Sequence, residues 1–142
     1  DPLSARAAMH RFPIRVYYED TDLAGIVYYA NYLKFIERAR SEWLRDLGVD
    51  QLRLKAGGLV FAVRRIEADY LSPARFDDQL TVETALQSLS PARIVLDQQV
   101  LREGQTLFTS RVTIVCVAES GRPARIPANV ALRVQGADLA SK

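Results

Sequence analysis

The chain has 142 residues and a mass of 15.9 kDa, a length at which a single domain is the usual expectation. Lysine and arginine number 19 against 17 aspartate and glutamate, so the net charge is only +2, and the basic residues are scattered rather than gathered as in a nucleic-acid-binding protein. The single cysteine, Cys116, excludes an intrachain disulfide and is typical of a reducing compartment, so we expect a cytoplasmic protein, and no apolar run is long enough to predict a transmembrane segment.

The first ten residues do not begin with Met and lack the basic start and apolar stretch of a signal peptide. We therefore expect residues 1–10, which include the only histidine, His10, to be disordered or vector-derived. Residues 11–135 are expected to form one domain, and residues 136–142 a tail.

The first regular elements are a strand and a long helix. Residues 12–19 are rich in β-branched and aromatic side chains, which favours a strand, and residues 20–25 form a polar break that ends in glycine. Apolar residues then recur every three or four positions, as on one face of a helix: Tyr29, Tyr32, Leu33, Ile36, Ala39, Trp43 and Leu47. Asn31 is expected to cap this helix and Gly48 to end it in left-handed geometry. Arg40 falls within the apolar stripe, so it should either extend to solvent or pair with a carboxylate such as Glu37.

Four strands follow at 59–71, 79–89, 93–102 and 105–119, after a short helix at 50–56. The turns between them are short, which predicts antiparallel neighbours, and nothing regular is predicted after residue 121 beyond a last turn. The chain is therefore expected to be an α+β protein, with a five-stranded antiparallel sheet wrapped around a long central helix. Such a sheet keeps open edges, and pairing with a second copy is the natural way to cover them.

Several common catalytic and cofactor motifs are missing from the sequence. There is no Gly-x-Ser-x-Gly elbow, no zinc-binding His-Glu-x-x-His or Cys-x-x-Cys pattern, and no phosphate or dinucleotide loop. Cys116 lies in the middle of a predicted strand without a histidine partner, so we expect a small buried apolar residue rather than a nucleophile. The sequence thus predicts neither a metal site nor an organic cofactor.

The carboxylates just before the long helix are the remaining candidates for chemistry. The spacing of Asp20, Asp22 and Gly25 resembles the opening of a calcium loop, but a ligand position holds Ala24 and the last one Asn31 instead of Glu. Taken alone, the residues favour the simpler interpretation, in which these aspartates accept backbone hydrogen bonds in a turn. The alternative is catalysis, because clustered carboxylates beside a helix N-terminus are suited to acid–base or nucleophilic work.

The segment from Val16 to Tyr32 is VYYEDTDLAGIVYYANY, and it resembles the signature of the hotdog-fold acyl-CoA thioesterases. The similarity is greatest to the bacterial Tol–Pal-associated (YbgC-like) type, which is related to 4-hydroxybenzoyl-CoA thioesterase. The similarity extends from about Phe12 to Leu132. Three further segments also resemble this type, FIERAR at 35–40, DYLSPAR at 69–75 and RPARIP at 122–127.

The resemblance implies a catalytic role for the second aspartate of the Asp-x-Asp motif, Asp22, as nucleophile or as general base for water. A thioester carbonyl is reactive and its thiolate leaves easily, so one carboxylate and preorganised donors for the oxyanion can suffice. We expect those donors to be backbone N–H groups at the helix start near Tyr29. Some relatives carry histidine where this chain has Tyr29, and a backbone donor survives that change.

The rest of the expected site follows from the same motif and its surroundings. Substrate-binding residues are expected at Gly25, Ile26, Val27 and Tyr32, with Arg93 at a strand–strand turn meeting the phosphates of coenzyme A. The expected function is hydrolysis of an acyl-CoA or acyl-carrier-protein thioester by a homodimer or homotetramer without cofactor. The alternatives are a non-catalytic acyl-binding protein on the same fold and a hydratase-like lyase, whose relatives depend on a histidine that this core lacks. The sequence does not indicate which acyl group is cleaved.

Overall fold

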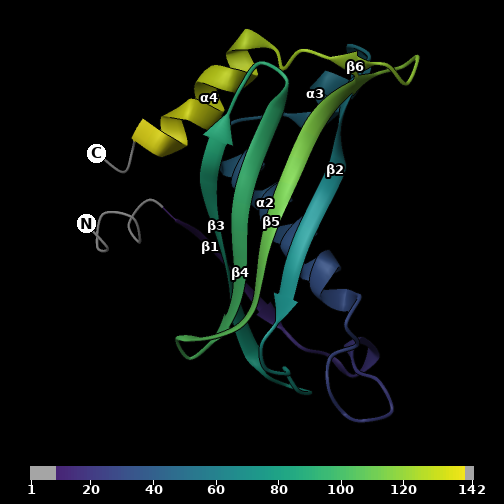
Figure 1. Ribbon diagram of the computed structural model, residues 1–142, viewed down its shortest axis with the longest axis vertical. Coiled ribbons are helices and arrows are strands. Elements are labelled where there is room, and N and C mark those ends of the chain that lie inside the picture. The colour runs from purple at the N-terminus through teal and green to yellow at the C-terminus, as the bar shows by residue number, and fades with distance from the viewer. Residues whose placement is uncertain (1–8, 140–142) are drawn as a thin grey trace.

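The computed structural model describes residues 9–139, so the expectation for residues 1–8 and for the last three residues lies outside the described residues. The chain forms an antiparallel sheet with helices, shown in Figure 1. The elements are β1 (His10–Arg15), a 3-10 turn η1 (Tyr18–Asp20), α2 (Asn31–Asp46), α3 (Gln51–Ala56), β2 (Leu59–Tyr70), β3 (Gln79–Leu89), β4 (Arg93–Arg102), β5 (Gln105–Ala118), β6 (Pro123–Ala124) and α4 (Ala128–Leu139).

The strands are ordered β1-β3-β4-β5-β2, and the short β6 adds to β5 beyond the start of β4. The predicted sheet wrapped around a long helix is confirmed, and the last four predicted strands agree with the structure to within a residue. The first strand was predicted too long. It ends at Arg15, because the Asp20 carboxylate accepts the N–H of Tyr17 and closes a 3-10 turn instead.

Helix α2 lies across one face of the sheet and supplies much of the core (Figure 1). Ile36 and Ala39 are completely buried, as their spacing predicts. Phe35, which the predicted stripe leaves out, is completely buried as well, whereas Leu33, which the stripe includes, is 37% exposed. Gly48 ends the helix with φ +84°, and the N–H of Val49 donates to the carbonyl of Leu44, as in a Schellman motif.

The predicted helix cap is wrong. Ala30 holds the cap position and Asn31 is the first helical residue. The Asn31 amide instead reaches back and donates to the carbonyl of Asp20 at 2.9 Å. A side chain expected to serve its own helix therefore ties that helix to the preceding loop.

The core beneath α2 contains a buried polar group. Arg40 is 9% exposed, and its guanidinium donates to the amide oxygen of Gln98 at 3.1 Å. Gln98 is itself fully buried and donates to Thr84 and to the carbonyl of Ile36. Arg40 was expected to reach solvent or to pair with a carboxylate. The structure gives it a neutral amide partner from the middle of β4 instead.

The C-terminal part is more regular than predicted. Helix α4 packs on β3 at the end of the sheet opposite the β1–α2 loop, burying Val130 and Val134 (Figure 1). This short stripe is too weak to predict a helix without knowledge of the surface that it covers. The helix extends into the predicted tail, and His10 begins β1 although it was assigned to the N-terminal segment. Among residues 9–139, no helix combines the length and apolarity needed to cross a bilayer.

Candidate active site

The loop between β1 and α2 reverses direction tightly around Asp22. The N–H of Asp22 donates to the carbonyl of Ile26, and the N–H of Gly25 donates to the carbonyl of Asp22. Gly25 has φ +81°, so the turn ends in the left-handed region that a side chain disfavours. Gly25 therefore permits the tight backbone path beside Asp22.

The Asp22 side chain is exposed and only partly engaged. One carboxylate oxygen, Oδ1, accepts the N–H of Ala24 at 2.9 Å, which fixes the direction of the side chain. The other oxygen makes no hydrogen bond or ion pair to any residue between 9 and 139. A carboxylate that is oriented but still open can accept a proton from water or attack an electrophile.

Asp20 has a different environment, although it lies only two residues away. It is 8% exposed, and its Oδ2 accepts the N–H of Tyr17 at 2.9 Å. Its carbonyl accepts both the N–H of Tyr28 and the side-chain amide of Asn31, each at 2.9 Å. Asp20 therefore holds the loop against the start of α2, which agrees with the turn and packing role expected for it.

The chain enters α2 through a turn at residues 28–31. The N–H of Asn31 donates to the carbonyl of Tyr28 at 2.8 Å, and the Tyr70 hydroxyl donates to the carbonyl of Tyr29 at 2.9 Å. The N–H of Tyr29 finds no acceptor within the described part of the chain. The N–H of Tyr29 is thus left open at the start of the helix, while the carbonyls of Tyr28 and Tyr29 both accept hydrogen bonds.

An apolar cavity of about 290 Å³ adjoins this turn. Four of the predicted site residues line it, together with four that were not predicted: Ile26, Val27, Tyr29, Tyr32, Tyr70, Leu71, Ser72 and Pro73. Tyr32 stacks on Phe108 with ring centroids 5.0 Å apart, and its oxygen accepts the N–H of Ala74. Burial raises the pKa of Tyr32, against the lowering effect of the Ala74 N–H, so its hydroxyl stays neutral.

The turn at residues 73–78 contacts the loop that carries Asp22. The N–H of Val27 donates to the carbonyl of Ala74 at 2.8 Å, and Ile26 pairs with Arg75 in an isolated bridge. These contacts join the two residues that follow Gly25 to a segment about fifty residues further along the chain. The position of the Asp22 loop therefore depends on the turn at 73–78.

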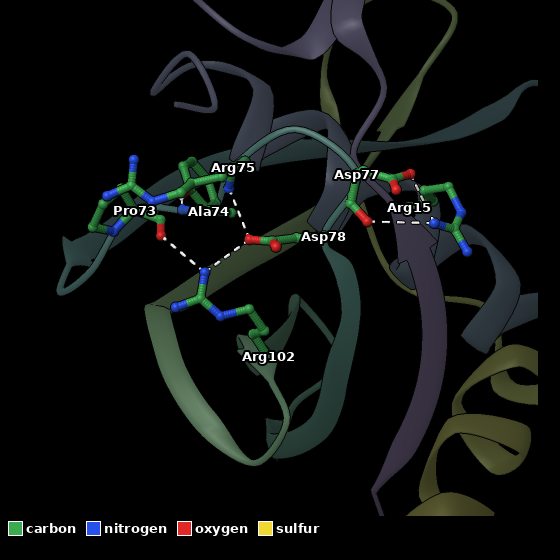
Figure 2. A network of polar contacts seen from close by, with 8 residues as sticks. Arg15, Pro73, Ala74, Arg75, Asp77, Asp78 and Arg102 are labelled. Atoms are coloured by element: carbon green, nitrogen blue, oxygen red, sulfur yellow. Dashed lines mark hydrogen bonds and ion pairs between the residues drawn. The ribbon is translucent and has the colours of Figure 1, made fainter. Parts of the chain in front are cut away.

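That turn is itself held by an ion pair, which Figure 2 shows. The Asp78 carboxylate accepts the N–H of Arg75 and the guanidinium of Arg102, both at 2.8 Å, and Arg102 also reaches the carbonyl of Pro73. Partial burial acts to raise the pKa of Asp78, but the Arg75 N–H and the Arg102 charge together hold it below its ordinary value. The sequence showed the acidic pair at 77–78 but gave no signal for its partner.

Arg93 is not brought to this site within one chain. It pairs with Val115 on β5, whereas Tyr70 pairs with Phe108, and these two β5 residues are seven positions apart, or about 23 Å along the strand. Arg93 is exposed beside Arg64 and Arg125 in a groove of about 930 Å³ at the other end of the sheet.

The other reactive side chains lie elsewhere. Cys116 is fully buried in β5, and burial raises the pKa of its thiol, which makes it a poor nucleophile. His10 on β1 contacts Asp46 at 2.7 Å, near the end of α2. Between residues 9 and 139, no cluster of three or more histidine, cysteine or acidic side chains is arranged to hold a metal ion.

Comparisons with known proteins agree with this arrangement. The model of the thioesterase-like superfamily matches residues 16–134. The acyl-CoA thioester hydrolase YbgC of Escherichia coli O6:H1 is 42% identical over 110 residues, or 77% of this chain and 82% of that protein. A probable thioesterase from Bartonella henselae has a TM-score of 0.81 and 41% identity, covering 84% of this chain and 99% of that one. A 4-hydroxybenzoyl-CoA thioesterase variant complexed with its substrate has a TM-score of 0.83 over 90% and 99% of the chains, and at 22% identity it shows the fold alone. The expected hotdog fold is confirmed.

Proposed function

Because this chain belongs to the thioesterase-like superfamily and is a thioester hydrolase, we propose that it cleaves acyl-CoA thioesters with Asp22 as the catalytic carboxylate. The observation that carries the assignment is the open oxygen of Asp22, on a side chain aimed by the Ala24 N–H. Asp20 has its carboxylate buried in the loop, so it is poorly placed to act on a substrate.

The reaction has two forms that use the same carboxylate. As a nucleophile, Asp22 attacks the thioester carbonyl carbon, the coenzyme A thiolate leaves, and water then hydrolyses the resulting anhydride to release the acid. As a general base, Asp22 takes a proton from water while the water oxygen attacks the same carbon, and the proton later passes to the departing thiolate. Both forms yield a carboxylic acid and a free thiol.

The N–H of Tyr29 is the proposed donor to the carbonyl oxygen as that oxygen becomes negative. It has no protein acceptor among residues 9–139, and the helix dipole of α2 adds positive potential there. The adjoining cavity of about 290 Å³, lined by Ile26, Val27 and Tyr32, would receive the acyl group. A preorganised donor costs no reorganisation during the reaction, which is why it lowers the barrier.

Assembly of two copies would give Arg93 a role at the same site. Strand β2 ends the sheet and leaves Val60 and Val63 almost half exposed along its edge. If a second copy pairs antiparallel on this edge, its Leu59 end lies beside Tyr70 of the first copy. Arg93, Arg64 and Arg125 of that second copy then approach the first site, where three cations suit the phosphates of coenzyme A. We therefore propose a homodimer, alone or within a tetramer.

The test is a panel of acyl-CoA thioesters with a chromogenic thiol reagent. The only cysteine, Cys116, is fully buried, so the protein itself contributes little background. We expect thiol release by the wild-type chain and its loss in Asp22→Asn. Tight binding of acyl-CoA without thiol release would instead support a non-catalytic acyl-binding protein, and acyl-carrier-protein thioesters in the same panel would show which carrier is used.

A further inference from the structure

Asn31, the first residue of α2, makes hydrogen bonds to both segments that carry the open groups of the proposed site. Its main-chain N–H donates to the carbonyl of Tyr28 at 2.8 Å, and its side-chain amide donates to the carbonyl of Asp20 at 2.9 Å. The Tyr28 carbonyl belongs to the same peptide as the N–H of Tyr29. The Asp20 carbonyl lies two residues before Asp22. One residue therefore contacts both the peptide of the proposed oxyanion donor and the loop of the proposed catalytic carboxylate.

We propose that Asn31 is a positioning residue for thioester hydrolysis, which holds the Asp22 loop and the Tyr29 N–H at a fixed separation. The inference rests on the proposed function, in which Asp22 acts at the thioester carbon and the Tyr29 N–H receives the carbonyl oxygen. That carbon and oxygen are bonded to each other, so the two groups must keep a set distance and direction for both to act in one transition state.

The position of Asn31 is itself fixed by the core. The next residue of the helix, Tyr32, is 3% exposed and stacks on the fully buried ring of Phe108 in β5, with centroids 5.0 Å apart. The oxygen of Tyr32 also accepts the N–H of Ala74 at 3.0 Å. The first turn of α2 is thus packed against the sheet, and Asn31 is held by a rigid element rather than by the loop that it contacts.

The two segments are also joined by a short antiparallel pair within the loop. The N–H of Asp22 donates to the carbonyl of Ile26, and the N–H of Tyr28 donates to the carbonyl of Asp20, both at 2.9 Å. Two paired segments alone twist easily. Among residues 9–139, the Asn31 amide makes the only hydrogen bond between α2 and residues 20–25. This bond fixes the orientation of the Asp22 loop relative to the helix.

The amide is not required to form the helix. Ala30 holds the cap position without a side-chain hydrogen bond, and asparagine is a weaker helix former than alanine. The Asn31 side chain therefore serves the loop, and its removal separates positioning from helix formation.

The test is Asn31→Ala, which removes the amide and keeps the main-chain N–H that holds the Tyr28 carbonyl. We expect kcat to fall about 10- to 100-fold, because a displacement of about 1 Å between reacting groups can cost about 10²-fold. KM should change by less than about twofold, since the loss belongs to the transition state. The affinity for S-ethyl-CoA, a thioether without a carbonyl, should equal that of the wild type, and thermal melts establish that the variant is folded.

The matched control is Asn129→Ala, which removes the same amide from an exposed position in the first turn of α4 and should leave kcat unchanged. A second variant, Asn31→Asp, keeps the shape of the side chain, but a carboxylate cannot donate to the Asp20 carbonyl. An acidic side chain at a helix N-terminus stabilises the helix, so this variant should keep α2 intact and still lose at least as much kcat as Asn31→Ala.

Three results would overturn the inference. Asn31→Ala could retain the wild-type kcat, it could lose efficiency through KM, or it could bind S-ethyl-CoA more weakly, each of which assigns the amide a binding or purely structural role. If Asn31→Ala is unfolded at the assay temperature, the same measurements on Asn31→Asp decide. If the wild type is active and Asp22→Asn is not, any of these results rejects only the role of Asn31. A wild type that releases no thiol from any acyl-CoA rejects the proposed function and this inference together.

Discussion

Replacing Asp22 with asparagine removes one negative charge and keeps the number of heavy atoms. The new amide oxygen can still accept the N–H of Ala24, so the local turn should survive. Asp22 is exposed and takes part in no ion pair among the described residues, so we expect the free energy of unfolding to change by no more than about 0.5 kcal/mol. Any loss of activity would then reflect a slower chemical step rather than unfolding of the protein.

The expected loss is a fall in kcat of about 10²–10⁴, which corresponds to about 2.7–5.4 kcal/mol of barrier. An amide oxygen is neither a useful base near neutral pH nor a competent nucleophile, so the full contribution of the carboxylate disappears. KM should change far less, because the lost interaction belongs to the transition state rather than to the bound substrate. Thiol release at several substrate concentrations gives both constants in one assay.

Two further variants separate a catalytic charge from a general effect of charge or loop stability. Glu19→Gln removes a charge from the same loop at an exposed side chain and should leave kcat near the wild-type value. Asp20→Asn disturbs the buried acceptor of the Tyr17 N–H, so it should lower thermal stability and reduce kcat clearly less than Asp22→Asn. Equal loss of kcat in folded Asp20→Asn and Asp22→Asn proteins would refute the assignment of the two roles.

Tyr29→Phe should retain most of the kcat because the proposed donor is the main-chain N–H. Gly25→Val should lose much more, since φ +81° is strained for any side chain even though nothing lies within 4 Å of a Cβ at that position. A Tyr29→Phe protein with as little activity as Asp22→Asn would assign the role to the phenol instead. Light scattering at micromolar concentration should give at least a dimer, and a fully active monomer would contradict the proposed pairing of edge strands. Because the pKa of Asp78 is lowered, its ionised carboxylate stabilises the fold at pH values above the ordinary pKa of an aspartate, and this stabilisation is lost as the pH falls below about 4. Asp78→Asn should therefore weaken the fall of Tm with decreasing pH in this acid range. An unchanged pH dependence of Tm would contradict the role of the ion pair with Arg102.

The elements with a clear local period could be predicted from the sequence. The apolar stripe of α2 and the alternation of β2 to β5 depend only on neighbours a few residues apart, so they are visible before folding. The same holds for Gly25 and Gly48, where the conformation follows from the residue type and its place in the chain. Asp22 could be singled out as well, although the residues alone left its role open between a turn acceptor and a catalyst.

Contacts between distant segments could not be predicted in this way. Asp20 and Asp22 have the same side chain within one short loop, and only the fold buries the first and leaves the second exposed. The neutral partner of Arg40 comes from the middle of β4, and the ion pair that steadies the turn at 73–78 comes from its end at Arg102. No periodic signal marks such pairs, because they are created when the strands assemble.

What the sequence determined by itself was therefore the set of elements and the loop that carries the chemistry. The tertiary structure decided which groups on that loop are held and which stay open, including the Tyr29 carbonyl that Tyr70 engages across 41 residues. It also placed Arg93 at the far end of the sheet, because antiparallel strands carry residues that are close in sequence to opposite ends of the fold. The physical reason is that local propensity acts within a few residues, whereas the orientation of a site depends on packing between segments that meet only in the folded chain.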